Sequence, residues 1–147
     1  MLYHPYILSF GLVLFIAGVA AGYRRAKSLP HGEKSRHILL VYPAYFIFLF
    51  AMALYYGYER RIALELAGGR EAFAATGLLS LHTASIAAAS VLLTITLIYG
   101  FALRNSIFTE KIGRKEIVHM VLGALGVTSY TLAVLTGLAM YVKAGVL

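Results

Sequence analysis

The sequence contains no cysteine, and this absence excludes disulfide bonds, covalently attached c-type haem and iron–sulfur clusters held by thiolates. It also contains no aspartate, so all six acidic residues are glutamates. Charged residues make up only 13% of the 147 residues, whereas soluble domains carry about 25%. Because a water-exposed surface needs more charge than this, the composition indicates an integral membrane protein with almost no soluble part.

Long apolar runs fill most of the chain: 61% of the residues are hydrophobic, and the mean hydropathy is +0.80. A transmembrane helix needs roughly 20 apolar residues to cross about 30 Å of hydrocarbon. Four runs reach that length, at about residues 5–22, 38–57, 73–103 and 117–142. Since unpaired backbone groups are too costly in lipid, each run should be a helix. We therefore predict an all-α fold in which residues 1–147 form one antiparallel four-helix bundle inside the membrane.

The basic residues predict the topology of the chain. Nine of the thirteen Lys and Arg residues precede the second and fourth runs, and the other four follow the second run or lie at the C-terminus. Cytoplasmic loops of membrane proteins are enriched in Lys and Arg. We therefore expect both termini outside and a multi-pass protein of the inner (cytoplasmic) membrane. The net charge of +7 is then explained by anionic lipid headgroups, and no nucleic-acid partner is expected.

Histidines near the ends of the predicted spans are the candidate functional residues, since ionisable groups in a membrane are costly. His37 and His119 open the second and fourth runs on the cytoplasmic side. At about 1.5 Å per residue, both lie roughly 16 Å from the centres of their spans. His82 and His4 lie on the outer side, and His31 lies in the first loop. Haem b needs two axial imidazoles, so we predict one haem on His37 and His119, with a weaker outer site on His82 and His4.

Such a site also needs a flat slot for the macrocycle and positive charge for its propionates. Small residues one or two turns after a histidine could open the slot, and basic residues beside the inner pair could neutralise the propionates. The residues that we assign to these roles are Gly123, Gly126, Ser85, Arg36, Arg114 and Lys115. In an alternative interpretation, the small residues only pack helices together, and the histidines only bind headgroups or carbonyls at the membrane surface.

Residues 31–147 resemble a family of small four-helix bacterial and archaeal membrane proteins that includes a maturation factor for haem-containing cytochrome oxidase. The matching residues are His37 in KSRHILL, His82 in LLSLHTAS, His119, and then Thr136, Gly137 and Tyr141 in the same order. The family usually has a further histidine beside a tyrosine near the outer end of its second span. Here that segment reads ALYYGYE, and His4 is the candidate replacement. The architecture is also similar to the cytochrome b561 core, in which alternate helices pair histidines on opposite membrane faces.

These features together predict a b-type haem protein that transfers electrons within the membrane. We expect it to be a subunit of a respiratory oxidoreductase complex, with lipid and the other subunits as partners and a quinone as a candidate redox partner. The sequence favours such an electron-transfer subunit over a stand-alone enzyme. The resemblance favours an alternative function, a cytochrome oxidase assembly factor that binds haem or copper transiently. A third alternative is a non-catalytic structural membrane subunit whose histidines bind nothing.

Overall fold

The computed structural model describes residues 2–27, 33–103 and 113–147. The described residues are almost entirely helical and include no strand. Four long helices dominate the fold: α1 (His4–Lys27), α2 (Glu33–Leu54), α5 (Leu79–Leu103) and α6 (Arg114–Lys143). Each of the four contains a segment that is long and apolar enough to cross a membrane. The prediction of an all-α chain with four candidate membrane spans is therefore confirmed.

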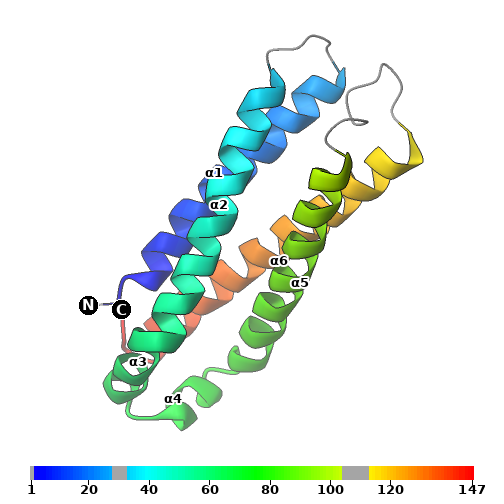
Figure 1. Ribbon diagram of the computed structural model, residues 1–147. Coiled ribbons are helices and arrows are strands. Elements are labelled where there is room, and N and C mark those ends of the chain that lie inside the picture. Colours follow the sequence, from blue (N-terminus) through cyan, green and yellow to red (C-terminus); the bar gives the residue numbers. More distant parts are fainter. Residues whose placement is uncertain (1, 28–32, 104–112) are drawn as a thin grey trace.

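The four helices associate as two pairs. Helix α1 packs along α2, helix α5 packs along α6, and α1 against α6 is the main contact between the pairs. Both chain termini lie at one end of the bundle (Figure 1), which we call the terminal end. The opposite end, where α1 and α5 finish and α2 and α6 begin, is called the loop end. Each predicted histidine pair can thus be assigned to one of these two ends.

The helical segment that starts with α2 continues beyond the expected end of the second span near Gly57. It passes through one π turn, η1 (Tyr55–Glu59), into the short helix α3 (Arg60–Ala67). Gly68 and Gly69 then end this helix with φ values of 79° and 116°, a backbone conformation that favours glycine. A second short helix, α4 (Arg70–Ala75), follows, so the third long helix begins at Leu79 and not near residue 73 as expected.

The main hydrophobic core lies in the middle of the bundle around Tyr130, whose side chain is fully buried. The ring of Tyr130 makes edge contacts with Phe15 and Phe48, and its hydroxyl donates a 2.7 Å hydrogen bond to the carbonyl of Leu8. This contact brings α6 so close to α1 that a Cβ added at Gly11 would lie 2.9 Å from the Tyr130 hydroxyl. The tyrosine therefore ties the two helix pairs together through one buried polar bond and its apolar ring.

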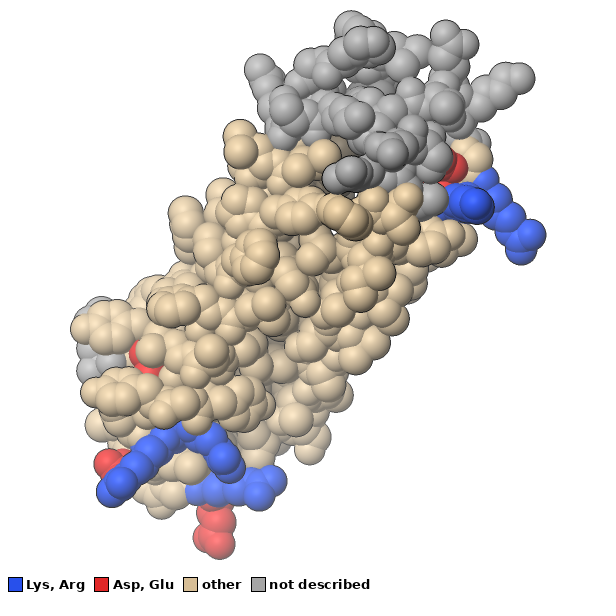
Figure 2. Space-filling model, in the orientation of Figure 1, with Lys and Arg blue, Asp and Glu red and all other residues tan. Residues whose placement is uncertain are grey.

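The outer surface of the bundle is apolar. Large side chains such as Leu39 and Ile98 are 70% and 65% exposed, as a lipid-facing surface requires. On the face shown in Figure 2, the described Lys and Arg residues gather at the two ends of the molecule and leave a band without Lys or Arg between them. This distribution fits a multi-pass membrane protein whose charged ends lie at the two membrane surfaces.

Candidate histidine sites

Four histidines lie in the long helices, two at each end of the bundle. His37 near the start of α2 and His119 near the start of α6 lie at the loop end, close enough to interact electrostatically. His4 at the start of α1 and His82 near the start of α5 lie at the terminal end and interact in the same way. The fifth histidine, His31, lies outside the described residues. The structure thus groups the four helical histidines as the sequence analysis paired them.

Two of these histidines are held by the neighbouring helix in the same manner. The ring of His37 lies against Gly22 of α1, and its Nδ1 is 2.7 Å from the carbonyl oxygen of Gly18. The ring of His82 lies against Gly137 of α6, and its Nδ1 is 2.9 Å from the carbonyl oxygen of Ala133. In both cases the carbonyl belongs to the residue four positions before the glycine. Because a carbonyl only accepts, Nδ1 carries the ring proton in both histidines.

His119 occupies the equivalent place between α5 and α6. A Cβ added at Gly100 would lie 2.6 Å from its ring, so this histidine also rests on a glycine of its neighbouring helix. Thr96, four residues before that glycine, interacts with the ring through its backbone. The geometry falls short of a hydrogen bond, however, and Nδ1 of His119 is buried with no hydrogen-bond partner in the described part of the chain. A buried polar atom of this kind is uncommon in proteins and marks a position where a ligand is worth testing.

The Nε2 atoms of these three histidines make no hydrogen bond to any described residue. Metal-bound histidines almost always donate the ring N–H that does not bind the metal to a carbonyl or a carboxylate, which fixes the ring and its tautomer. His37 and His82 have this second interaction in place. The same arrangement also links two helices without any metal, so it defines candidate ligands and no more.

A buried carboxylate at the terminal end was missed by the sequence analysis. Glu59, at the end of η1, is only 1% exposed. It accepts hydrogen bonds from the backbone N–H groups of Tyr3 and His4, at 2.7 and 3.1 Å, and its Oε2 is 2.7 Å from Nδ1 of His4. On the other side of the His4 ring, Nε2 is 3.0 Å from the hydroxyl of Tyr141. The chain thus builds a buried carboxylate–imidazole–phenol series across three helical elements.

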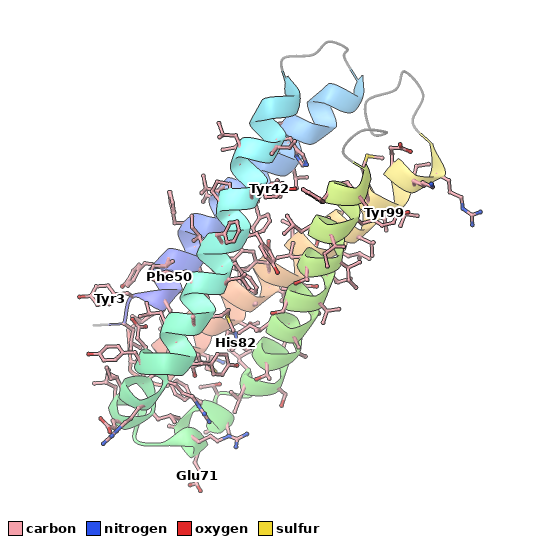
Figure 3. The ribbon with its side chains drawn as sticks, viewed as in Figure 1. Tyr3, Tyr42, Phe50, Glu71, His82 and Tyr99 are labelled. Atoms are coloured by element: carbon pink, nitrogen blue, oxygen red, sulfur yellow. The ribbon has the colours of Figure 1, made fainter. Side chains whose placement is uncertain are left out.

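His4 and His82 face a common cavity. It has a volume of about 10 Å³ and is also lined by Tyr141 and Gly137. Figure 3 shows His82 in the interior of the bundle, whereas Tyr3 and Phe50 point away from it. This volume is close to that of one water molecule, so a haem does not fit between the outer histidines in this arrangement.

The remaining predicted site residues have varied surroundings. A Cβ at Gly123 would meet Thr96 at 3.4 Å, and one at Gly126 would meet Leu93 at 2.8 Å, so both glycines lie where α6 packs closely on α5. Ser85 is buried, and both Arg114 and Lys115 are exposed beside the loop end. The side chain of Arg36 lies outside the described residues. Among the residues that the structure describes, no three His, Cys, Asp or Glu side chains form a group able to hold a metal ion.

The fold and these sites define a class of molecule: a helical bundle of four candidate membrane spans with a histidine pair at each end. Comparison with known proteins finds no matching protein-family model, curated protein or solved structure.

Proposed function

We propose that this chain is a membrane-embedded b-type haem protein that transfers electrons, with His37 and His119 as the two axial ligands at the loop end. In this proposal the four helices form an antiparallel bundle in the cytoplasmic membrane, both termini lie outside, and the haem lies toward the cytoplasm. Electrons pass to or from a partner subunit of a respiratory oxidoreductase complex, with a quinol as the candidate donor.

The observation that carries this proposal is the matched seating of the two histidines. Each lies near the start of its helix, rests on a glycine of the neighbouring helix and has no hydrogen bond on Nε2 from the described residues. An axial imidazole needs a fixed ring, a proton on Nδ1 and a free Nε2, and His37 meets all three requirements. Nδ1 of His119 has no hydrogen-bond partner in the described part of the chain, and the backbone of Thr96 is the group near it that could accept its proton.

The packing at the loop end also suits a flat cofactor. Gly18 is the only buried residue among the described residues of the loop end, and the others are half-buried or exposed. The residues meant are 16–22, 37–43, 95–102 and 113–125. The compact core is confined to the middle and the terminal end. A haem placed between the two helix pairs at the loop end would therefore cover half-exposed apolar surface. Arg114 and Lys115 are available there to pair with its propionates.

Bound haem b would supply the one-electron chemistry, and the protein sets its potential through ligands, burial and nearby charge. The residues of this chain hold the imidazoles at a fixed orientation, keep the ring proton on Nδ1 of His37, and line the haem with apolar side chains that exclude water. The exposed Arg114 and Lys115 would pair with the propionates, and because they lie at the water-facing edge, solvent and salt would weaken their effect on the potential.

The test is a reduced-minus-oxidised absorption spectrum of protein purified from its native membrane. We expect the sharp α-band of a low-spin b-type haem in the wild type, and its loss in His37→Ala and in His119→Ala. The matched control is His31→Ala, which removes the histidine that lies outside the predicted spans and should leave the band unchanged.

A featureless spectrum from the wild type, purified in its native complex, would contradict the haem proposal. Metal analysis of the same sample would then separate the two alternatives. Substoichiometric haem or copper would support a transient assembly factor, and neither metal would support a structural subunit.

A further inference from the structure

The cavity at the terminal end suits a single ion. We propose that it is a mononuclear site for a divalent transition-metal ion that prefers imidazole, the class to which Zn²⁺ and Cu²⁺ belong. Its ligands are Nε2 of His4, Nε2 of His82 and the phenolate oxygen of Tyr141, and Glu59 supports His4 from behind. This site is separate from the haem site proposed at the loop end and does not depend on it.

The size of the cavity carries the first part of the inference. Its volume of about 10 Å³ admits one water-sized occupant and nothing larger. The two histidines and Tyr141 are the lining residues able to bind a metal, and the rest of the lining is apolar or small, including Leu8, Val134 and Gly137. The occupant is therefore a single small species surrounded by three candidate ligands in a mainly apolar wall.

The orientation of the two histidine rings also supports a metal site. Glu59 Oε2 lies 2.7 Å from Nδ1 of His4, and the Ala133 carbonyl lies 2.9 Å from Nδ1 of His82. Both imidazoles are thus held through Nδ1. Nε2 of His82 has no hydrogen bond from the described residues, and Nε2 of His4 contacts the hydroxyl of Tyr141. A carboxylate behind a histidine is the arrangement found behind many zinc ligands, where it fixes the ring and raises its basicity.

The distance between two of the ligand atoms already suits one ion. Nε2 of His4 and the hydroxyl oxygen of Tyr141 are 3.0 Å apart. Two ligands at about 2.0 Å from a tetrahedral ion are separated by about 3.3 Å. Binding would replace the hydrogen bond between these atoms: the phenolic proton of Tyr141 leaves to solvent, and both atoms then bind the metal.

The buried negative charge of Glu59 also favours a bound cation. Glu59 is almost fully buried, and its one ion-pair partner among the described residues is His4. Two of its hydrogen bonds come from backbone N–H groups at the start of α1, so the carboxylate also caps that helix. This capping explains the position of the carboxylate, but its negative charge has no ion-pair partner other than His4 among the described residues. A divalent ion beyond the imidazole would neutralise both this charge and the phenolate in a region of low dielectric constant.

The π turn η1 is an independent observation that favours a functional site here. The turn ends at Glu59, and its preceding residues Tyr56, Gly57 and Tyr58 are all exposed. A π turn inserts one extra residue into the helix, costs stability and occurs frequently at functional sites. Here it brings the carboxylate of Glu59 inward, toward the start of α1.

Equilibrium dialysis of the purified, chelator-treated protein against Zn²⁺, with metal analysis, tests the proposal. We expect one Zn²⁺ per chain and at least a tenfold weaker affinity in His82→Asn and in Tyr141→Phe. Glu59→Gln should weaken binding by about 10- to 100-fold, as is usual when the group behind a ligand is lost. Tyr45→Phe is the matched control, because it removes a tyrosine hydroxyl that bonds Thr94 and does not line the cavity, and it should bind Zn²⁺ as the wild type does.

A double variant, His37→Ala with His119→Ala, separates this site from the proposed haem site. It should still bind one Zn²⁺ per chain, even if the haem proposal is wrong. The proposal would be overturned if the wild type bound no Zn²⁺, if His82→Asn and Tyr141→Phe bound it as tightly as the wild type, or if the double variant alone lost it. Helix content and melting temperature of each variant would be measured, so that weaker binding counts only in folded protein.

Discussion

Removal of the Glu59 carboxylate should destabilise the bundle more than any surface change. The side chain accepts three hydrogen bonds, from the backbone of Tyr3, the backbone of His4 and the ring of His4. In Glu59→Ala all three donors lose their acceptor, and the two of His4 are buried. Loss of one member of a buried charged pair typically costs about 3–5 kcal/mol. Hydrogen bonds inside membranes contribute about 0.6 kcal/mol on average, so a value near 3 kcal/mol is expected.

Glu59→Gln should cost less, because the ring of His4 can adapt. The amide oxygen can still accept from the backbone of Tyr3, while the amide NH₂ faces the two His4 donors. A change of tautomer lets Nδ1 of His4 accept from this NH₂ and lets Nε2 donate to Tyr141. One buried backbone N–H of His4 then remains unpaired, at a cost of about 1–3 kcal/mol.

The assay is reversible unfolding in detergent, followed by circular dichroism, with the free energies of unfolding compared. Glu65→Ala is the matched control, because Glu65 is an exposed glutamate in a single surface ion pair with Arg61. Exposed pairs of this kind contribute little, so its unfolding should match that of the wild type. The reasoning would be refuted if Glu59→Ala and Glu65→Ala unfolded alike, since the buried hydrogen bonds of Glu59 would then have no energetic effect.

Two further predictions concern close helix contacts. A Cβ at Gly137 would lie 2.8 Å from the ring of His82, so Gly137→Ala should displace the ring and cost about 1–3 kcal/mol of unfolding free energy. Gly57→Ala is the control, because a Cβ there meets nothing within 4 Å. Equal melting temperatures of the two variants would contradict the contact between Gly137 and His82. Tyr130→Phe removes a 2.7 Å hydrogen bond to the carbonyl of Leu8 and should cost about 0.5–1.5 kcal/mol in denaturant unfolding; a stability equal to that of the wild type would mean that the hydroxyl adds nothing to the contact between α1 and α6.

The long helices could be predicted from the sequence because length and hydropathy are local properties. Each of the four apolar runs falls largely within one long helix. The continuation through η1 into α3 could not be read in the same way. The segment after Leu54 mixes tyrosines, arginines and a glutamate, and its low hydropathy resembles that of a loop. Only the contacts of the folded chain keep it helical as far as Ala67, where Gly68 ends it.

Glu59 was missed for a related reason. Its burial depends on the start of α1, more than 50 residues away in the sequence, and no local pattern contains that contact. A signal was nonetheless present, since Glu59 directly follows the tyrosine-rich segment ALYYGY and joins the apolar second run. An acidic residue continuous with a membrane span is costly unless it is paired. The contacts between the histidines and the glycines could not be predicted either, because they depend on the register of two neighbouring helices.

The difference between the two ends of the bundle follows from the surroundings of its fourth histidine. His37, His82 and His119 each rest on a glycine of the neighbouring helix. The residue four positions before that glycine accepts a hydrogen bond from His37 and from His82 through its backbone carbonyl, and its backbone lies near the ring in His119. His4 instead faces the ring of Tyr55, at 4.6 Å between ring centres, and its Nδ1 is paired with the carboxylate of Glu59. The loop end thus presents two histidines that each rest on a glycine, as the proposed pair of axial haem ligands requires. The terminal end presents two unlike ligands and a buried negative charge, and this combination suits a small cation.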